Sequence, residues 1–247
     1  MALVSVIIPY YKKKNQINET LSSVLAQSFQ DLEVILVYDD TEIRDLNIIQ
    51  DKFKNNTKIK IIRNPKNLGA GISRNIGIKN STAEYIAFLD SDDFWHHKKL
   101  EKQITFMKEN NYDFTYCNYV KKKVGGKDIN VDSIKKRITY EDLLSDCSIG
   151  LSTVVIKKRI IKEELFPPLK TKEDYTAWLK LTKNKFYAYN LPYSLVTWNY
   201  SKDSLSSSLI QKLKDGFIVY YKYEKFSFLK SIFYLFKLSI NSLKRKF

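Results

Sequence analysis

The sequence is poor in the residues that build disulfide frameworks and zinc sites. Its 247 residues include two cysteines, Cys117 and Cys147, and two histidines. Cysteines so few and so far apart exclude a disulfide framework or a zinc centre and favour a reducing compartment. No apolar run is long enough to cross a bilayer, and the chain opens without a basic segment or a cleavable small-residue pattern. We therefore expect neither a membrane span nor a secretory signal.

Acidic residues are scarce in the second half of the chain. The net charge is +15, yet residues 1–110 hold 16 Lys and Arg against 14 Asp and Glu, which leaves 26 against 13 for residues 111–247. This excess indicates a polyanionic neighbour, either nucleic acid or an acidic membrane surface, or else a plain lysine-rich surface. Because no nucleic-acid recognition motif accompanies the charge, we expect no nucleic-acid partner.

Strand-like and helix-like segments alternate four times in the first ninety residues. Each apolar run rich in Val, Ile and Phe predicts a buried strand, and the alternation predicts a parallel sheet with right-handed crossovers. The runs are VSVIIP from Val4, LEVILVY from Leu32, KIKIIR from Lys58 and YIAFLD from Tyr85. The predicted helices carry three stripes: Ile17, Leu21, Val24 and Leu25; Ile43, Leu46, Ile49 and Phe53; and Ile72, Ile76 and Ile78.

The regular alternation of strands and helices ends after a further predicted helix at 98–109. We predict a strand with a Gly-Gly turn at 113–129, a helix at 139–146, a strand at 152–158, a helix at 173–181 and two more strands at 185–190 and 193–200. From about residue 212 the pattern is helical. The organisation we expect is one catalytic domain, 1–210, followed by a basic amphipathic helical tail, 211–247.

The loops that follow the four predicted strands are aromatic, acidic or glycine-bearing. They read PYYKKK, YDDTE, RNPKNLGAG and DSDDFW in chain order. In an open parallel sheet, ligands bind beyond the carboxyl ends of the strands, where these loops converge. We therefore expect a functional site at this edge of the sheet.

Three aspartates within four positions, Asp90, Asp92 and Asp93, end the fourth predicted strand. Crowded carboxylates repel one another unless a cation lies between them. Asp90 and Asp92 form a D-x-D pair, and such hard oxygen ligands suit Mg²⁺ or Mn²⁺ together with a substrate diphosphate. The alternative is that the aspartates cap a helix beginning near Trp95.

These motifs, taken in order, resemble the family 2 glycosyltransferases of the GT-A fold. The opening segment 4–40, the segment NLGAGISRNIGIKNSTAEYIAFLDSDDFW and the later KEDYTAW carry the resemblance, which covers roughly residues 4–207. The resemblance implies an α/β, Rossmann-like fold with a mostly parallel central sheet flanked by helices. It also implies an inverting, metal-dependent transfer of a sugar from a nucleotide-diphosphate donor, with UDP as the expected nucleotide and Mn²⁺ or Mg²⁺ as the cofactor.

The resemblance assigns the donor site residue by residue. It implies nucleotide-binding roles for Pro9, Tyr11, Asp39, Asp40, Arg74, Asp90 and Ser91, and metal-binding roles for Asp92 and Asp90. Asp39 is the expected partner of the base edge, with Asp40 as the alternative because YDD stands where VDD is usual. Arg74 would help to order the pocket, and its alternative interpretation is a surface arginine.

The acceptor side rests on KEDYTAW. The resemblance implies that Asp174 is the general base and that Glu173 contacts the acceptor; the alternative is that both acids complement a helix dipole. Further on, Asn199 and Ser201 stand where the family often has phosphate-binding Arg and His, and Lys202 is a possible electrostatic substitute. Trp178 is either a core or an acceptor-platform residue, and His96 and His97 suit the surface start of a helix better than a metal site.

The tail carries an apolar face bordered by lysines. Phe226, Leu229, Phe233, Phe236, Ile240 and Leu243 share one side of the predicted helix. Such a helix suits an anionic membrane interface, and the alternative is that it covers the catalytic domain or pairs two subunits. We expect a cytoplasmic protein at the inner face of the membrane, acting on a glycan or glycolipid acceptor. Rival functions are a nucleotidyltransferase, which would need a glycine in PYYKKKN, and a silent nucleotide-binding scaffold.

Overall fold

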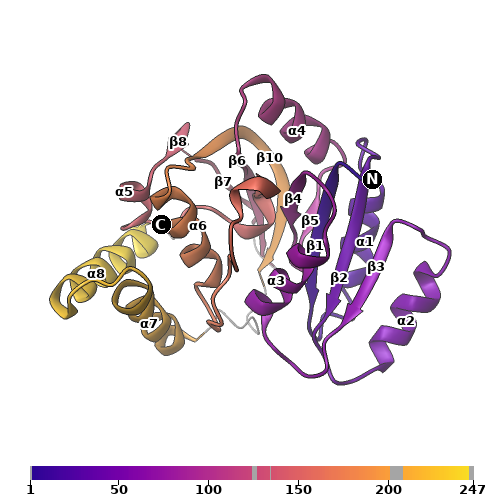
Figure 1. Cartoon of the computed structure of the whole chain (residues 1–247), viewed down its shortest axis with the longest axis horizontal. Coiled ribbons are helices and arrows are strands. Elements are labelled where there is room, and N and C mark those ends of the chain that lie inside the picture. The colour runs from indigo at the N-terminus through magenta and orange to yellow at the C-terminus, as the bar shows by residue number, and fades with distance from the viewer. Residues whose placement is uncertain (1, 124–126, 134, 201–207, 245–247) are drawn as a thin grey trace.

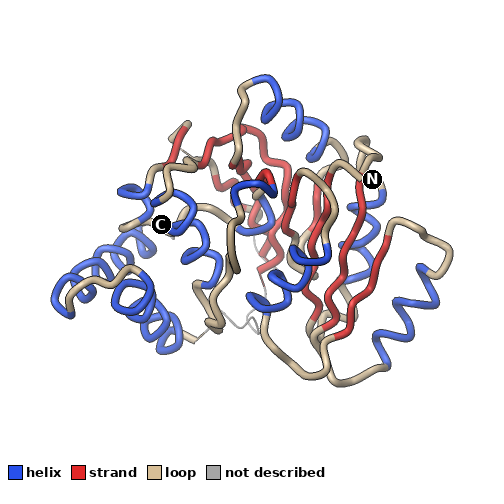
Figure 2. The backbone as a smooth tube through the Cα atoms, viewed as in Figure 1, coloured by secondary structure: helices blue, strands red, loops and turns tan. Residues whose placement is uncertain are grey.

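A central ten-stranded sheet, covered by helices on both faces, organises the chain in the computed structural model (Figures 1 and 2). The structure describes residues 2–123, 127–133, 135–200 and 208–244. The strands are β1 Val4–Tyr10, β2 Leu32–Tyr38, β3 Ile59–Arg63, β4 Tyr85–Phe88, β5 Phe94–Trp95, β6 Phe114–Lys123, β7 Ile129–Val131, β8 Arg137–Ile138, β9 Val155–Lys157 and β10 Ala188–Tyr200. The helices are α1 Ile17–Leu25, α2 Arg44–Phe53, α3 Ala70–Asn80, α4 Lys99–Glu109, α5 Tyr140–Leu143, α6 Glu173–Lys183, α7 Leu209–Ile218 and α8 Phe228–Lys244, with short η1 Leu151–Thr153 and η2 Lys158–Ile160.

The first four strands form the expected parallel half of the sheet, in the order β3-β2-β1-β4. β1 and β2 lie in register from Val4 opposite Leu32 to Tyr10 opposite Tyr38. Their runs of Val, Ile and Leu are continuous rather than alternating because both faces of these strands are buried. The carboxyl ends of the four strands consequently reach the same edge.

The second half of the sheet is mixed in direction. β9 runs antiparallel to both β4 and β6, and β6 and β10 run parallel. The two strands expected at 185–190 and 193–200 are wrong, because a single strand, β10, spans Ala188–Tyr200. Its pairing with β6 shifts register between Leu191 and Val196, around Pro192, which has no N–H to donate to the ladder.

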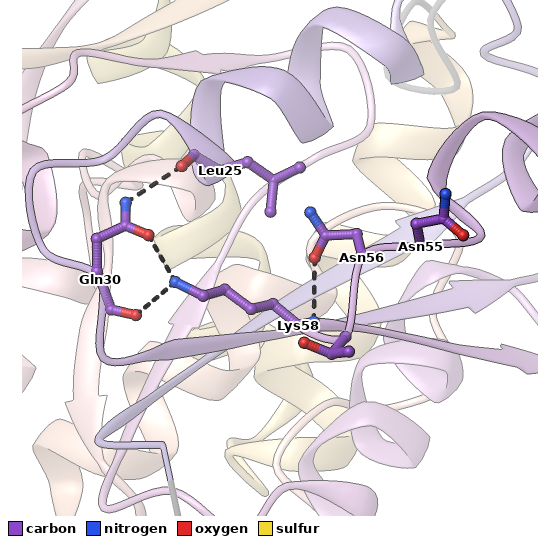
Figure 3. A pocket seen from close by; sticks show the side chains of 6 residues that line it. Leu25, Gln30, Asn55, Asn56 and Lys58 are labelled. Atoms are coloured by element: carbon purple, nitrogen blue, oxygen red, sulfur yellow. Dashed lines mark hydrogen bonds between the residues drawn. The ribbon is translucent and has the colours of Figure 1, made fainter.

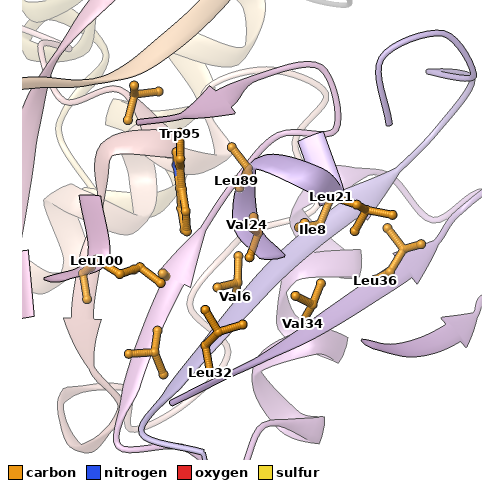
Figure 4. Packing of buried hydrophobic residues seen from close by; sticks show 14 of the residues in the cluster. Val6, Ile8, Leu21, Val24, Leu32, Val34, Leu36, Leu89, Trp95 and Leu100 are labelled. Carbon is orange, nitrogen blue, oxygen red and sulfur yellow. The ribbon is translucent and has the colours of Figure 1, made fainter. Parts of the chain in front are cut away.

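Two hydrophobic cores lie on opposite faces of the sheet. Figure 4 shows the first, where Val6 and Ile8 of β1 pack with Leu21 and Val24 of α1. α2 and α4 complete this layer. On the other face Trp178 of α6 is fully buried, 5.2 Å from the ring of Phe114 between ring centroids. α3, α5, α6 and α8 cover this side, so Trp178 is a core residue and not an acceptor platform.

The C-terminal segment is helical but not continuous. α7 begins at Leu209, passes into a π-helical turn at Val219–Tyr223 and stops, and α8 starts afresh at Phe228. Lys225 in the connection has a φ of 58°, a left-handed conformation that interrupts a helix. The helical tail expected from about residue 212 is therefore present, as two helices with a break between them. None of the helices that the structure describes is both long and apolar enough to span a bilayer.

Candidate active site

The loops after β1, β2, β3 and β4 meet at the edge predicted from the sequence, and Asp39 ties two of them together. Its carboxylate accepts hydrogen bonds from the Asn64 side chain (2.7 Å) and from the backbone N–H groups of Leu68 (2.8 Å) and Gly69 (2.8 Å). Gly69 has a φ of 88°, a backbone conformation that favours glycine, and it directly precedes α3. Asp39 thus fixes the loop that starts α3.

The other predicted nucleotide-binding residues line the same edge. Pro9 is buried near the end of β1. Tyr11, the first residue after β1, is half-buried, and the Lys12 ammonium lies 5.2 Å from the centroid of its ring. Asp40 is buried and accepts a hydrogen bond from the backbone N–H of Glu42 (3.2 Å). Their roles toward a nucleotide stay predictions.

α3 buries its polar side, and of the predicted isoleucine stripe it fully buries Ile78 alone. Arg74, Asn75 and Ser73 are buried, while Ile72 and Ile76 are half-buried. The alternative of a surface arginine is wrong: the Arg74 side chain is 4% exposed. The reason is electrostatic, since its guanidinium has two carboxylates to pair with inside the protein.

Arg74 connects the loop after β4 to the start of α6. One terminal nitrogen donates to Asp90 and the other to Glu173, both at 2.7 Å. Burial by itself opposes the charge, yet the two carboxylates raise the pKa of Arg74 above its usual value. Its Nε is buried and has no hydrogen-bond partner among the described residues. The structure therefore brings together residues predicted for the donor and acceptor sides.

The acidic loop after β4 divides its three carboxylates between two tasks. Asp93 is buried and accepts from the Ser152 hydroxyl (2.6 Å) and the backbone N–H of Asn199 (3.2 Å). Asp90 and Asp92 remain partly exposed, and Asp92 pairs with the Lys13 ammonium at 2.8 Å. Burial, followed by the neighbouring charge of Asp90, raises the pKa of Asp92.

The capping alternative for this loop is wrong. α4 begins at Lys99, six residues after Asp93, and has no side-chain cap. Ser91 is buried, and its backbone oxygen accepts from the Thr20 hydroxyl at 3.1 Å, which fixes the loop against α1. The buried hydrogen bonds of Asp93 give it a structural role, whereas Asp90 and Asp92 stay partly exposed.

Glu173 and Asp174 occupy the first turn of α6, where the helix dipole favours negative charge. Burial raises the pKa of Glu173 to about 7 even though Arg74 opposes the shift, and the Asp174 charge adds to it. Burial likewise raises the pKa of Asp174, and Arg74 and Lys172 partly offset this. A raised carboxyl pKa is a common property of catalytic acids and bases.

Gly71 allows α3 to approach α6 closely. A Cβ added there would lie 2.7 Å from the Pro167 carbonyl oxygen and 3.3 Å from Cγ of Glu173. The next helical turn is fastened too, because the Asn75 amide donates to the Phe166 carbonyl (2.8 Å) and accepts from the Phe166 N–H (3.0 Å). The position of Glu173 thus depends on α3.

Sequence reasoning missed Lys13 and Ser152. Lys13 could have been found, because it stands in the loop after β1, at the same edge as Asp92. Ser152 lies far along the chain, and no motif marks it. Asn199, noted as a departure from the family, holds the acidic loop by donating its amide to the Asp92 carbonyl at 2.6 Å.

Two further expectations concern residues beside these. His96 and His97 are exposed ahead of α4, as expected of a surface helix start. Ser201 and Lys202 lie outside the described residues.

The carboxylates fit a hard divalent cation that also binds a diphosphate. Asp90 and Asp92 are close enough for one charge to raise the pKa of the other, and Asp92 already holds a cationic ammonium. No three His, Cys, Asp or Glu side chains of the described chain gather into a metal cage. Mg²⁺-like ions usually take one or two protein carboxylates and leave the remaining positions to substrate phosphates and water.

A crevice of about 250 Å³ lies elsewhere, at the amino ends of β2 and β3 (Figure 3). Lys58 in its wall donates to the backbone and side-chain oxygens of Gln30, at 2.7 and 2.5 Å. Gln30, Asn56 and Lys58 bond to other groups of its wall, and no carboxylate lines it. We therefore assign no catalytic role to this crevice.

Comparison with known proteins gives consistent results. Residues 5–166 match the family described as Glycosyl transferase family 2. An uncharacterized glycosyltransferase of Haemophilus influenzae is 33% identical over 244 residues, covering 98% of this chain and 96% of the relative. The Escherichia coli UDP-Glc:alpha-D-GlcNAc-diphosphoundecaprenol beta-1,3-glucosyltransferase WfgD is 35% identical over 223 residues, covering 86% and 83%.

Solved structures show the same architecture. S. aureus TarS 1-349 in complex with UDP-GlcNAc superimposes with a TM-score of 0.74 at 22% identity, over 96% of this chain and 71% of that one. Mannosyltransferase PcManGT from Pyrobaculum calidifontis in complex with GDP-Man and Mn2+ gives 0.70 at 14% identity, over 98% and 73%. The GT-A fold expected from the sequence is confirmed.

Proposed function

Since this chain belongs to glycosyl transferase family 2, we propose that it transfers a sugar from a nucleotide-diphosphate donor to a hydroxyl of a bacterial surface glycan acceptor. UDP is the proposed nucleotide, and inversion is the proposed stereochemical outcome. The acceptor we favour is lipid-linked, because the relative WfgD is named for a diphosphoundecaprenol acceptor. We place the enzyme at the inner face of the cytoplasmic membrane.

The observation that carries this proposal is the double ion pair of Arg74. It joins Asp90, on the proposed donor side, to Glu173, on the proposed acceptor side, with both distances at 2.7 Å. A transferase for two substrates needs them held next to each other in a fixed orientation. A buried arginine held by two carboxylates supports such an arrangement.

The proposed reaction assigns the proton to Asp174. The acceptor hydroxyl oxygen attacks the anomeric carbon, its proton passes to the Asp174 carboxylate, and the bond from the anomeric carbon to the phosphate oxygen breaks with its electron pair leaving on the nucleoside diphosphate. Attack from the face opposite the leaving group inverts the anomeric centre. Glu173, held by Arg74, would orient the acceptor.

Asp92 and Asp90 would hold the divalent cation, Mn²⁺ or Mg²⁺. Such an ion supplies Lewis-acid neutralisation of the leaving diphosphate charge. Pro9, Tyr11, Asp39 or Asp40, and Ser91 would surround the nucleoside. Lys13 lies beside Asp92 and could add positive charge for the phosphates.

The test is a donor screen with purified enzyme. With Mn²⁺ and a matching UDP-sugar, we expect slow donor hydrolysis and faster transfer when the acceptor is added. Asp174→Asn should lower the transfer rate by about 10²- to 10⁴-fold, the usual contribution of a general base, while donor binding stays intact. Asp92→Ala should abolish metal-dependent donor protection in thermal shift.

Asp128→Asn is the matched control, because Asp128 is exposed and lies outside the site. Full turnover by both Asp174→Asn and Asp92→Ala would contradict the assigned roles. One observation favours the scaffold alternative, namely that Asn199, which stands for the family arginine, is used to hold the acidic loop. Nucleotide binding by calorimetry with no transfer to any acceptor would support that alternative.

A further inference from the structure

Exposed apolar side chains concentrate on the C-terminal helices. Of the 14 large hydrophobic side chains that stand exposed in the described residues, ten lie between Leu209 and Leu243. Scattered single residues of this kind are ordinary on a protein surface, whereas a contiguous patch marks an interaction site. α7 and α8 lie side by side at the end of the molecule opposite α2 (Figure 1).

α8 has one apolar face toward the protein and another toward solvent. Ser231 and Leu238 are buried against the domain, and Asn241 donates to the Ser145 carbonyl at 2.9 Å. On a helix of 3.6 residues per turn, the exposed apolar residues cover an arc of about 140°. They are Phe228, Leu229 (78% exposed), Ile232, Phe233, Phe236 (65%) and Leu243. Two residues of the predicted stripe are exceptions: Phe226 precedes α8 and packs inward, and Ile240 is half-buried.

α7 extends the same surface. Leu209, Ile210 and Leu213 are exposed on it. The Phe217 ring of α7 contacts the Phe228 ring of α8, with centroids 5.6 Å apart. The two exposed faces therefore form one surface, which we call the α7–α8 face.

The charge around the α7–α8 face is of one sign. Its exposed lysines are Lys214, Lys222, Lys225, Lys230 and Lys237. The acidic residues of 208–244 are Asp215 and Glu224, and both are buried. With both carboxylates turned inward, the charged side chains that the described segment 208–244 exposes are lysines.

We propose that the α7–α8 face docks onto an anionic lipid bilayer, with its apolar side chains in the interface and its lysines at the head groups. A second copy of the chain is disfavoured as the occupant because pairing two such faces would bring lysines of the same sign together. The inference deepens the proposed function, on which it rests for a lipid-linked acceptor.

The two buried carboxylates also connect this face to both ends of α6. Asp215 accepts hydrogen bonds from the backbone N–H (2.8 Å) and the hydroxyl (2.9 Å) of Thr171. Thr171 lies two residues before Glu173, the first residue of α6. Glu224 accepts from the Tyr140 hydroxyl (2.5 Å) and from the ammonium of Lys183 (2.8 Å), the last residue of α6. A bilayer bound to the α7–α8 face would therefore set the orientation of α6, and of Asp174 in its first turn, relative to the membrane.

The test is sedimentation of the full chain with phosphatidylcholine vesicles, with and without phosphatidylglycerol. We expect binding to the anionic vesicles that weakens as salt is added, and much weaker binding to the neutral ones. Leu229→Ser combined with Phe236→Ser should lower the partition coefficient at least about tenfold, because two exposed apolar side chains no longer enter the lipid. Ile43→Ser with Ile48→Ser, at exposed apolar positions by α2, is the matched control and should bind as the wild type does.

Charge gives a second, independent variant. Lys230→Gln with Lys237→Gln should reduce the salt dependence of binding to anionic vesicles. The inference is overturned if the wild-type chain does not bind these vesicles or if the α2 control pair loses as much binding as the α8 pair. It is also overturned if the chain is a dimer in solution that the Leu229→Ser, Phe236→Ser pair converts to monomers, since a second copy would then be the occupant.

Failure of this inference can be told apart from failure of the proposed function. The Leu229→Ser, Phe236→Ser variant should hydrolyse a soluble donor at the wild-type rate and lose transfer to a lipid-linked acceptor in vesicles. Vesicle binding with no sugar transfer to any acceptor would refute the function and leave the docking face standing. Transfer to a vesicle-borne acceptor without vesicle binding would refute the docking face alone.

Discussion

Replacing Arg74 by methionine should be among the most destabilising single substitutions in the site. The guanidinium is 4% exposed and makes two ion pairs at 2.7 Å. Asp90 is 36% exposed, so water can hydrate it once the arginine is gone. Glu173 is 13% exposed and adjoins Asp174, so without Arg74 it must either stay ionised with no partner or take up a proton, and both cost free energy. Removing one partner of a buried ion pair costs about 3–5 kcal/mol.

The measurement is thermal unfolding followed by circular dichroism. For a chain of this size each kcal/mol lowers Tm by about 2–4 °C, so Arg74→Met should lower it by about 6–20 °C. Arg159→Met is the matched control, since Arg159 is 62% exposed and pairs with Asp113 on the surface, and such a pair contributes about 0–1 kcal/mol.

A double mutant separates the charge left behind from the lost packing. Arg74→Met with Glu173→Gln removes the buried acid that has lost its partner and should be more stable than Arg74→Met alone, by about 1–3 kcal/mol at a pH above 7, where ionisation of Glu173 costs most. The electrostatic argument is refuted if Arg74→Met costs no more than Arg159→Met, or if adding Glu173→Gln recovers nothing.

Three further predictions follow from the same contacts. Gly71→Ala should cost about 1–3 kcal/mol and lower turnover by displacing Glu173, whereas Gly150→Ala, whose added Cβ meets its nearest atom at 3.5 Å, should be tolerated; denaturant titration compares the two. Because the folded pKa of Glu173 is about 7 and its ordinary value 4.5, the folded state holds a proton that the unfolded state releases between these pH values. The contribution of Glu173 to the free energy of unfolding should therefore fall as pH rises from about 4.5 to 7, and Glu173→Gln should remove this slope. Cys117 is buried and burial raises its thiol pKa to about 11, so in a Cys147→Ser background a thiol reagent should label it only after denaturation; rapid labelling of the native protein would contradict its placement.

Much of the fold was predictable because the apolar runs along the sequence match the strands that the sheet buries. The strands at Val4 and Leu32 carry uninterrupted apolar runs, which only burial on both faces explains, and the structure confirms them. The strand that contains Pro192 was not predictable as one element, since a proline inside a run normally marks its end. Its continuation depends on pairing with β6, a tertiary contact that no local pattern announces.

The candidate site divides in the same way. Asp90, Asp92, Glu173 and Asp174 stand in recognisable motifs, and the structure gathers them at one edge. The burial of Arg74 was left open, because a guanidinium on a helix is exposed unless distant carboxylates reach it, and Glu173 is 99 residues away in sequence. Ser152 had no local signal for the same reason: its bond to Asp93 spans 59 residues.

The Asn75 contacts determine when this site can form during folding. Asn75 directly follows Arg74 on α3. Its side-chain amide bonds to the backbone of Phe166, 91 residues further along the chain. A nascent polypeptide released from the ribosome only as far as β4 has the four parallel strands but lacks the segment against which α3 is held. Contacts of such long sequence separation close slowly and late. Fragments truncated before residue 165 should consequently fold poorly around α3 and leave core residues such as Ile7 and Ile78 uncovered, an apolar surface that chaperones bind.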